Sequence, residues 1–253
     1  MKAYGFLYMT AAALLLSACS DKEEGIGEPV AATVQAGIST RATVDNTWTA
    51  GEDAIGVYVT SAGATKGSNI KYVASDHAGS FSPAYEPIYF VDGKDVTFCA
   101  YYPYTDDSEM NSDGTINWKG GIVKDGKCQW DFLFADGATA RKSSPVVSFT
   151  GDKAFRHCMA MVKFTIKAGY GIVSGEKLLN FIMDEVHNDG VVDPRDGTVM
   201  LSAEKTALTE PVNQTLGNDL TISIILLPQA VTDKSIDIIL ETSVEDTKNK
   251  YST

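Results

Sequence analysis

Basic residues are scarce in this chain, and so are histidines. Its 253 residues contain 21 Lys and Arg against 33 Asp and Glu, which gives a formal net charge of −12. An acidic protein is repelled by nucleic acid and by anionic membrane surfaces, so we expect neither as a direct partner. Contact with a membrane would then have to come from an apolar segment or a covalent lipid.

Residues that build catalytic sites are also rare. The chain has three histidines, His77, His157 and His187, and no two of them are spaced as ligands of one metal ion. The sequence contains no G-x-S-x-G elbow, no phosphate-binding P-loop and no dinucleotide fingerprint. We therefore expect a non-enzymatic protein without catalytic residues, metal or cofactor, and a histidine such as His157 is expected to be structural.

One group of carboxylates leaves an alternative open. Its members lie close together in the sequence with two glycines and an asparagine: Asp184, Glu185, Asp189, Asp193 and Asp196. Oxygen ligands of this kind suit calcium, but their spacing differs from that of a calcium-binding loop, and successive hairpin turns explain the same residues. A secreted hydrolase, which needs two facing carboxylates, is the other alternative, and an acidic chain offers such pairs by chance.

Cysteines are few and widely spaced. Beyond Cys19 the chain has Cys99, Cys128 and Cys158, with no C-x-x-C pair. Three thiols cannot all pair within one chain. Cys99 and Cys158 lie in strand-like runs, where we interpret them as small apolar core residues. One disulfide among the three cysteines is compatible with an oxidising compartment, but the sequence does not require it.

Long hydrophobic runs are absent after the first two dozen residues. The apolar stretch from Met9 to Ala18 follows the positive Lys2 and is shorter than the roughly 20 residues that span a bilayer. It ends in Leu16-Ser17-Ala18-Cys19, the pattern of a bacterial lipoprotein signal, in which Cys19 receives the lipid. We therefore assign residues 1–18 as the signal peptide, with an ordinary secretory signal as the alternative.

Alternating hydrophobicity dominates the rest of the chain. In Val30–Ile38 every second residue is apolar, as expected of a strand with one buried face. Asp-Gly pairs between such runs favour tight turns, and no long helical period is present. We predict an all-β, sandwich-type fold. The further expected strands are Ala54–Thr60, Ile70–Ala74, Pro87–Val91, Val96–Tyr102, Val146–Thr150, Cys158–Ile166, Leu178–Val186, Thr198–Leu201, Leu220–Leu227 and Ile236–Thr242.

The composition changes near residues 151–156, from a turn-rich, polar segment at 103–143 to more regular apolar strands. We therefore predict a lipidated tether with the first strand at 19–41, an N-terminal β-domain at 42–152 and a C-terminal β-domain at 153–253. Aromatic residues gather before this boundary, and they either pack in the core, which we favour, or form a platform that stacks on sugars. They are Phe98, Tyr101, Tyr102, Tyr104, Trp118, Trp130 and Phe132.

Four segments in order resemble the fimbrillin-like (Mfa-like) lipoproteins of Bacteroidota. They are Thr40–Thr43, Trp48–Tyr58, Phe155–Phe164 and Leu226–Gln229. The acidic residues Asp21, Glu23 and Glu24 also resemble the signal that exports such lipoproteins to the outer face of the outer membrane.

The resemblance implies two β-sandwich-like (transthyretin-like) domains in tandem and a role as a type V pilus subunit, whether stalk, tip or anchor. In polymerising members an arginine-specific protease cuts after the first strand, which places the candidate cleavage bond here between Arg41 and Ala42. The released strand leaves a groove that a strand of the next subunit fills. The implied partners are other pilus subunits and, through Cys19, the outer membrane, until cleavage releases the protein into fimbriae.

Two expectations remain beside this one. Family members typically continue past a segment like Ile236–Thr242 into a further strand pair, so the C-terminal domain is expected to be incomplete or the sequence a fragment. The alternative function is a solitary surface lipoprotein that binds host or dietary glycans through exposed aromatic residues.

Overall fold

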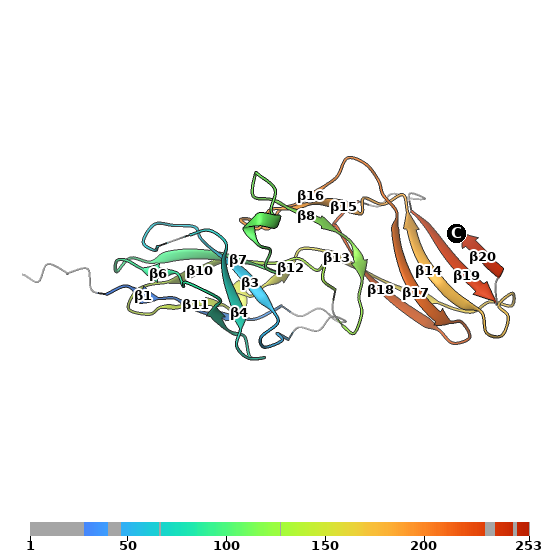
Figure 1. The fold of residues 1–253 in the computed structure, drawn as a ribbon, viewed down its shortest axis with the longest axis horizontal. Coiled ribbons are helices and arrows are strands. Elements are labelled where there is room, and N and C mark those ends of the chain that lie inside the picture. Colours follow the sequence, from blue (N-terminus) through green and yellow to red (C-terminus); the bar gives the residue numbers. More distant parts are fainter. Residues whose placement is uncertain are drawn as a thin grey trace, which may run out of the picture.

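The computed structural model describes residues 28–39, 47–65, 67–126, 128–230, 236–244 and 247–252. Almost all regular structure in these segments is β-strand, beside two single-turn 3-10 helices, η1 (Asp107–Glu109) and η2 (Gly151–Lys153). The all-β prediction is confirmed. The molecule is elongated, with β1–β7 and β10–β12 towards one end and β13–β14 and β17–β20 towards the other (Figure 1).

The largest sheet has eight strands in the order β11-β2-β5-β4-β3-β7-β10-β12. Strand β10 runs into β11 through a tight turn closed by the Arg141–Ser144 bridge, although the two lie far apart in the strand order. The sheet therefore curls so that its two ends approach each other. Its strands are β2 (Thr33–Ala36), β3 (Ala54–Val59), β4 (Ile70–Ala74), β5 (Ser80–Pro83), β7 (Val96–Tyr102), β10 (Leu133–Ala140), β11 (Val146–Phe149) and β12 (Arg156–His157). The short β1 (Val30–Ala31) pairs separately with β6 (Tyr89–Phe90).

The concave side of this sheet encloses an apolar core. Aromatic and β-branched side chains from most of its strands meet there, among them Ile55, Phe81, Phe98 and Phe149, all at most 3% exposed. Burial of each such side chain contributes about 1.5–3 kcal/mol, so this cluster is a main source of the stability of this end of the molecule.

At the other end, two sheets pack across a second apolar cluster that includes Leu178, Phe181, Ile222 and Ile224. One sheet has the order β13-β18-β9 and the other β17-β14-β19-β20. Their strands are β9 (Gly121–Ile122), β13 (Ala160–Ile166), β14 (Lys177–Asp184), β17 (Leu208–Thr215), β18 (Leu220–Leu226), β19 (Asp237–Val244) and β20 (Thr247–Ser252).

A small sheet, β16-β15-β8, lies between the two ends (Figure 1). It consists of β8 (Ile116–Lys119), β15 (Asp189–Val192) and β16 (Val199–Leu201). The loop between β15 and β16 packs on the eight-stranded sheet: the Cys99 thiol donates to the Arg195 carbonyl at 3.3 Å. In the same loop, a Cβ on Gly197, whose φ is +77°, would lie 2.6 Å from the Phe134 ring. These contacts hold the loop between β15 and β16 against strands β7 and β10 of the eight-stranded sheet.

The division of the chain at residue 152 stays a prediction. Strands β8 and β9 come before that point in the sequence, yet β8 pairs with β15 and β9 pairs with β18, which both come after it. The early part of the chain therefore contributes strands to sheets built mainly from the late part.

Two expected turns prove to be parts of strands. Asp136-Gly137 lies inside β10, where the register with β7 shifts between Asp136 and Ala138 and Gly137 has a φ of +68°. This is a β-bulge, in which the glycine supplies the positive φ that a turn would also require. Asp189-Gly190 begins β15, and the chain bends earlier, at residues 185–186.

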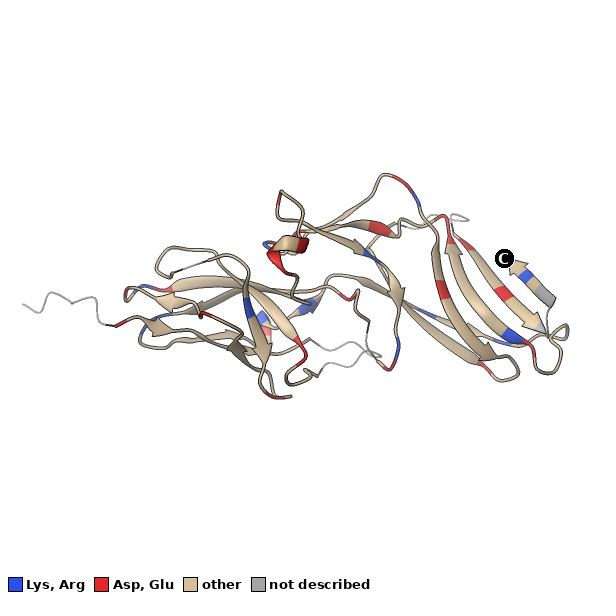
Figure 2. Cartoon of the chain, in the orientation of Figure 1, with Lys and Arg blue, Asp and Glu red and all other residues tan. Residues whose placement is uncertain are grey.

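Charged residues are spread over the loops and strands, with acidic residues prominent on η1 (Figure 2). The carboxylate of Glu176 is instead buried, and the residue is only 1% exposed. It accepts hydrogen bonds from the Thr242 hydroxyl on β19 and from the Val173 amide at 3.2 Å. The bond from Thr242 is the main reason why the pKa of Glu176 lies below its usual value, although burial opposes it.

Acidification is expected to remove the stabilisation that Glu176 provides. Because its pKa is lower in the folded state, its contribution is fully present above the unfolded-state value of about 4.3 and is lost as the pH falls through the folded-state pKa. We expect Glu176→Gln to lower the free energy of unfolding at pH 7, with the gap to the wild type closing towards pH 3. Urea unfolding at both pH values measures this. Glu109→Gln, at an exposed carboxylate, is the control, and a gap independent of pH would contradict the prediction.

Candidate functional site

Strand β2 occupies the interior of the eight-stranded sheet, although it is one of the first strands of the chain. It pairs in parallel with β11, from Thr33 opposite Val146 to Ala36 opposite Phe149, and antiparallel with β5. A strand in this position has neighbours on both edges, so its removal would split the sheet rather than trim it. We call β2 and the groups that hold it the first-strand site.

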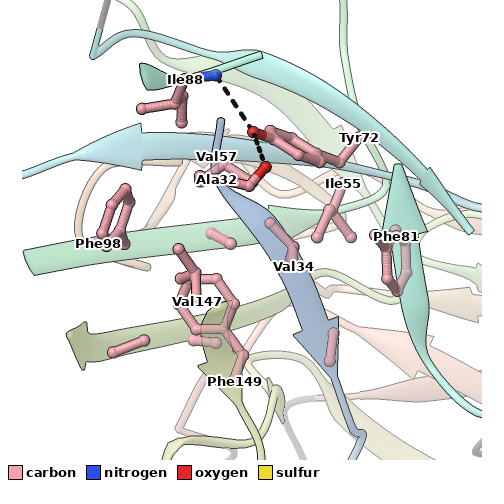
Figure 3. Close-up of a cluster of buried hydrophobic side chains, with 14 of the residues drawn as sticks. Ala32, Val34, Ile55, Val57, Tyr72, Phe81, Ile88, Phe98, Val147 and Phe149 are labelled. Carbon is pink, nitrogen blue, oxygen red and sulfur yellow. Dashed lines mark hydrogen bonds between the residues drawn. The ribbon is translucent and has the colours of Figure 1, made fainter. Parts of the chain in front are cut away.

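The inner face of this segment is small and fully buried. Ala32, Val34 and Ala36 are 1%, 1% and 2% exposed, whereas Thr33 between them is exposed. Val34 points into the core towards Ile55, as Figure 3 shows. The predicted alternation over Val30–Ile38 is thereby confirmed at its centre. Small side chains at these positions leave room for the large aromatic groups around them.

Backbone hydrogen bonds hold one edge of the segment along its whole length. The amides of Thr33 and Gly37 donate to the carbonyls of Pro145 and Phe149 at 3.0 and 2.9 Å. Beyond β11 the pattern continues, because the Ser39 amide donates to the Phe155 carbonyl at 2.8 Å. The backbone hydrogen-bonding groups along this edge are therefore paired with β11 and with the chain that leads into β12.

The other edge is completed by two buried side chains. Strand β5 pairs with this segment only at Val34 and Gln35, so the carbonyls of Ala32 and Ala36 lie outside the paired stretch. The Tyr72 hydroxyl donates to the Ala32 carbonyl at 3.3 Å, and the Trp48 indole N–H donates to the Ala36 carbonyl at 2.8 Å. Tyr72 and Trp48 thus take the place of missing backbone donors.

Both donors are fixed in place. The Tyr72 hydroxyl also accepts from the Ile88 amide at 3.3 Å, as Figure 3 shows, and burial raises the pKa of Tyr72, which keeps its proton in place. The Trp48 ring is 3% exposed and packs edge-on against Phe81 and Phe155, with centroids 5.1 and 5.6 Å apart. Their positions do not depend on contacts with β2 alone.

Ser39 and Trp48 anchor the chain on either side of residues 40–46. The Ser39 hydroxyl donates to the Phe155 carbonyl at 2.7 Å, and the Trp48 carbonyl accepts from His77 Nδ1 at 2.6 Å. The candidate cleavage residues Arg41 and Ala42 fall between these anchors but outside the described residues, as does the candidate lipidation residue Cys19.

The histidines have structural partners. His157 Nδ1 lies 2.7 Å from an Asp131 carboxylate oxygen, and both side chains are 6% exposed. His187 Nδ1 donates to the Ser202 carbonyl at 3.0 Å. His77 binds the Trp48 carbonyl, as described above. Each of the three histidines therefore orients a loop or a strand end, which is the structural role expected for His157.

The acidic group at 184–196 is likewise used within loops. Asp193 binds the Arg195 guanidinium through both of its oxygens, at 2.8 and 2.6 Å. Asp196 accepts from the Thr198 amide at 2.8 Å, and Asp189 accepts from the Thr206 hydroxyl. Over the described segments, no group of three or more His, Cys, Asp or Glu side chains is arranged to hold a metal ion. These contacts give the acidic group a role in turn structure.

No disulfide joins Cys99, Cys128 and Cys158 where the structure describes them. Cys99 is buried, and burial raises the pKa of its thiol to about 12 and that of Cys128 to about 11. Both are therefore protonated at neutral pH and poorly nucleophilic.

The aromatic group at 98–132 divides into core and surface residues. Phe98, Tyr101, Trp118 and Phe132 are at most 5% exposed, which confirms core packing for these four. Trp130 is half-buried.

None of the helices in the described segments has the length and apolar character needed to traverse a bilayer.

The fold defines a protein of the all-β class, with an early strand held inside its largest sheet. A sequence profile described as fimbrillin-like matches residues 40–253, and the chain belongs to this family. Family membership supports a surface adhesive structural role, a location at the cell surface and a non-enzymatic protein. No curated protein matches the chain.

Solved structures support the fold. A candidate cell adhesion protein from Bacteroides ovatus matches with a TM-score of 0.67 and 23% identity, over 89% of this chain and 86% of its own. Another from Bacteroides uniformis matches with a TM-score of 0.61 and 23% identity, over 88% of this chain and 84% of its own.

Proposed function

We propose that the protein is a subunit of a surface filament that assembles by strand exchange. The observation that carries this proposal is the place of β2, an N-terminal strand held in the interior of a sheet. In the proposed reaction β2 leaves and an equivalent strand of another subunit takes its place. One contact of this head-to-tail kind on each subunit builds a filament.

The energetic argument rests on what the departing strand leaves behind. The facing edges of β11 and β5 would lose their backbone partners, and the core around Val34 would be open to water. Unpaired edges and exposed apolar surface both favour the capture of another strand. The incoming strand would need small apolar residues at alternate positions, and the donors Tyr72 and Trp48 would set its register.

The lipid at Cys19 holds the precursor at the outer membrane in this proposal. A cut between Arg41 and Ala42 separates Cys19 and β2 from the rest of the chain, so one event would free the subunit and open its groove. A subunit that is cut would enter the fimbria as stalk or tip, and one that keeps Cys19 would be an anchor.

We expect Arg41→Ala to block this maturation and leave a lipidated monomer. N-terminal sequencing of protein from intact cells measures the outcome directly: the wild type should begin at Ala42, and the variant should stay blocked at an acylated Cys19. Arg141→Ala, which replaces an exposed arginine of another turn, should leave processing unchanged. Cleaved, assembled material from Arg41→Ala would overturn the proposed cleavage bond.

A second candidate function is favoured by the half-buried Trp130. A lipoprotein that stays anchored through Cys19 could present this aromatic residue to a host or dietary glycan. Protein with an intact, acylated N-terminus that binds glycans and forms no filaments would support this reading over strand exchange.

A further inference from the structure

Trp130 is held at the surface in a fixed orientation. Its carbonyl accepts from the Trp118 indole N–H at 2.7 Å, and the two rings meet edge to face with centroids 5.6 Å apart. Gly121 lies against the ring, where a Cβ would come within 2.6 Å of Trp130 Cδ1. The ring therefore has a defined position, which a binding surface requires.

Two hollows share Trp130 and Gln129 in their walls. Their volumes are about 280 and 330 Å³, near the lower end of the range of small-molecule sites. Beside the shared pair, the first is lined by Gly121, Ile122, Lys124, Cys128 and Glu210. The second is lined by Pro103, Thr105, Glu109, Ile116, Asn117 and Trp118. The residue pair 129–130 thus forms a ridge between two subsites.

The polar groups of these hollows are of mixed kinds. The amides of Asn117 and Gln129 each offer both donors and acceptors, and both side chains are exposed. Within the described part of the chain, the Trp130 indole N–H has no hydrogen-bond partner, in contrast to that of Trp118. The ammonium group of the exposed Lys119 lies over one face of the Trp130 ring, 4.9 Å from its centroid, so a stacked ligand would use the opposite face and the ammonium group offers further donors at the edge of the site.

We propose that Trp130 and the two hollows form a binding site for a neutral oligosaccharide. A sugar ring combines weakly positive C–H groups, which the negative face of an aromatic ring attracts, with hydroxyls that both donate and accept hydrogen bonds. The hollows offer both features together. Two subsites on either side of one ridge suit a chain of at least two sugar units.

Charge favours a neutral ligand over an acidic one. Lys124 and Glu210 line the first hollow together, and Lys119 beside the ring is balanced by Glu109 in the second. The site therefore carries no net charge, and the surrounding protein is strongly acidic. A sialylated or other anionic glycan gains no net attraction here. The site does not involve β2, so it is independent of strand exchange.

The experiment is binding of the full processed chain to a printed array of neutral and sialylated oligosaccharides, followed by isothermal titration calorimetry with the neutral oligosaccharide bound most strongly. Trp130→Ala is expected to weaken binding by at least about tenfold, as for removal of a central aromatic contact. Gln129→Ala is expected to weaken it by a smaller factor. Tyr170→Ala removes a fully exposed aromatic residue elsewhere and should bind as the wild type does.

Thermal unfolding of each variant shows whether its fold is retained. Gln129→Ala truncates an exposed side chain, so it tests the site even if Trp130→Ala does not fold. The proposal is overturned if no neutral oligosaccharide binds, if binding is confined to sialylated glycans, or if both variants bind as tightly as the wild type. Weaker binding by folded variants supports it.

Discussion

A chain that begins at Ala42 is expected to be less stable by about 5 kcal/mol or more than one that retains residues 28–41. The truncated chain loses the burial of Val34 and of the two alanines on the same face of the strand, Ala32 and Ala36. It also loses several backbone hydrogen bonds to β11 and β5, each of which contributes about 1 kcal/mol net. A synthetic peptide of residues 28–39 should restore most of this stability, because it supplies the same strand without the covalent link. Denaturant unfolding with and without the peptide measures both effects.

The register and the sequence specificity with which the groove binds the added strand can be tested in the same assay. A peptide of the same composition in scrambled order should restore little stability, because it cannot place small apolar residues at three alternate positions. Trp48→Phe removes the indole donor to the Ala36 carbonyl and should weaken capture of the native peptide. Equal rescue by the native and scrambled peptides would contradict a specific groove.

Much of the fold follows from local pattern. Strands such as β4 and β7 match their predicted ranges, because alternating apolar residues bounded by turn residues leave few other conformations. Strand β10 was missed because Asp136-Gly137 is a strong turn signal, which here forms a bulge. Strand β17 was missed because it contains Pro211, which an edge strand tolerates.

The first-strand site could be predicted only in part. The alternation of Ala32, Val34 and Ala36 identifies a strand with one buried face, but it does not say which strands flank it. Its parallel partner β11 lies more than a hundred residues away, and such pairing is decided by the packing of the whole core. The roles of Tyr72 and Trp48 follow from the short stretch over which β5 pairs with β2, which only the structure reveals.

Replacing Val34 by Asp in the intact chain is expected to have the other very large effect. The side chain is 1% exposed and lies in the apolar cluster, so the carboxylate would be buried without a partner or would have to take up a proton. We expect a loss of about 4 kcal/mol or more, enough to unfold this end of the molecule or expel β2.

Thr33→Asp is the matched control for this substitution. Thr33 is the neighbouring residue on the same strand, but its side chain is exposed, so the same charge should change stability by less than about 1 kcal/mol. Urea unfolding followed by tryptophan fluorescence distinguishes the two, because Trp48 packs beside the end of β2 and reports its departure. Similar losses in both variants would mean that the two faces of β2 are equally buried, which contradicts the alternation on which the proposed exchange depends.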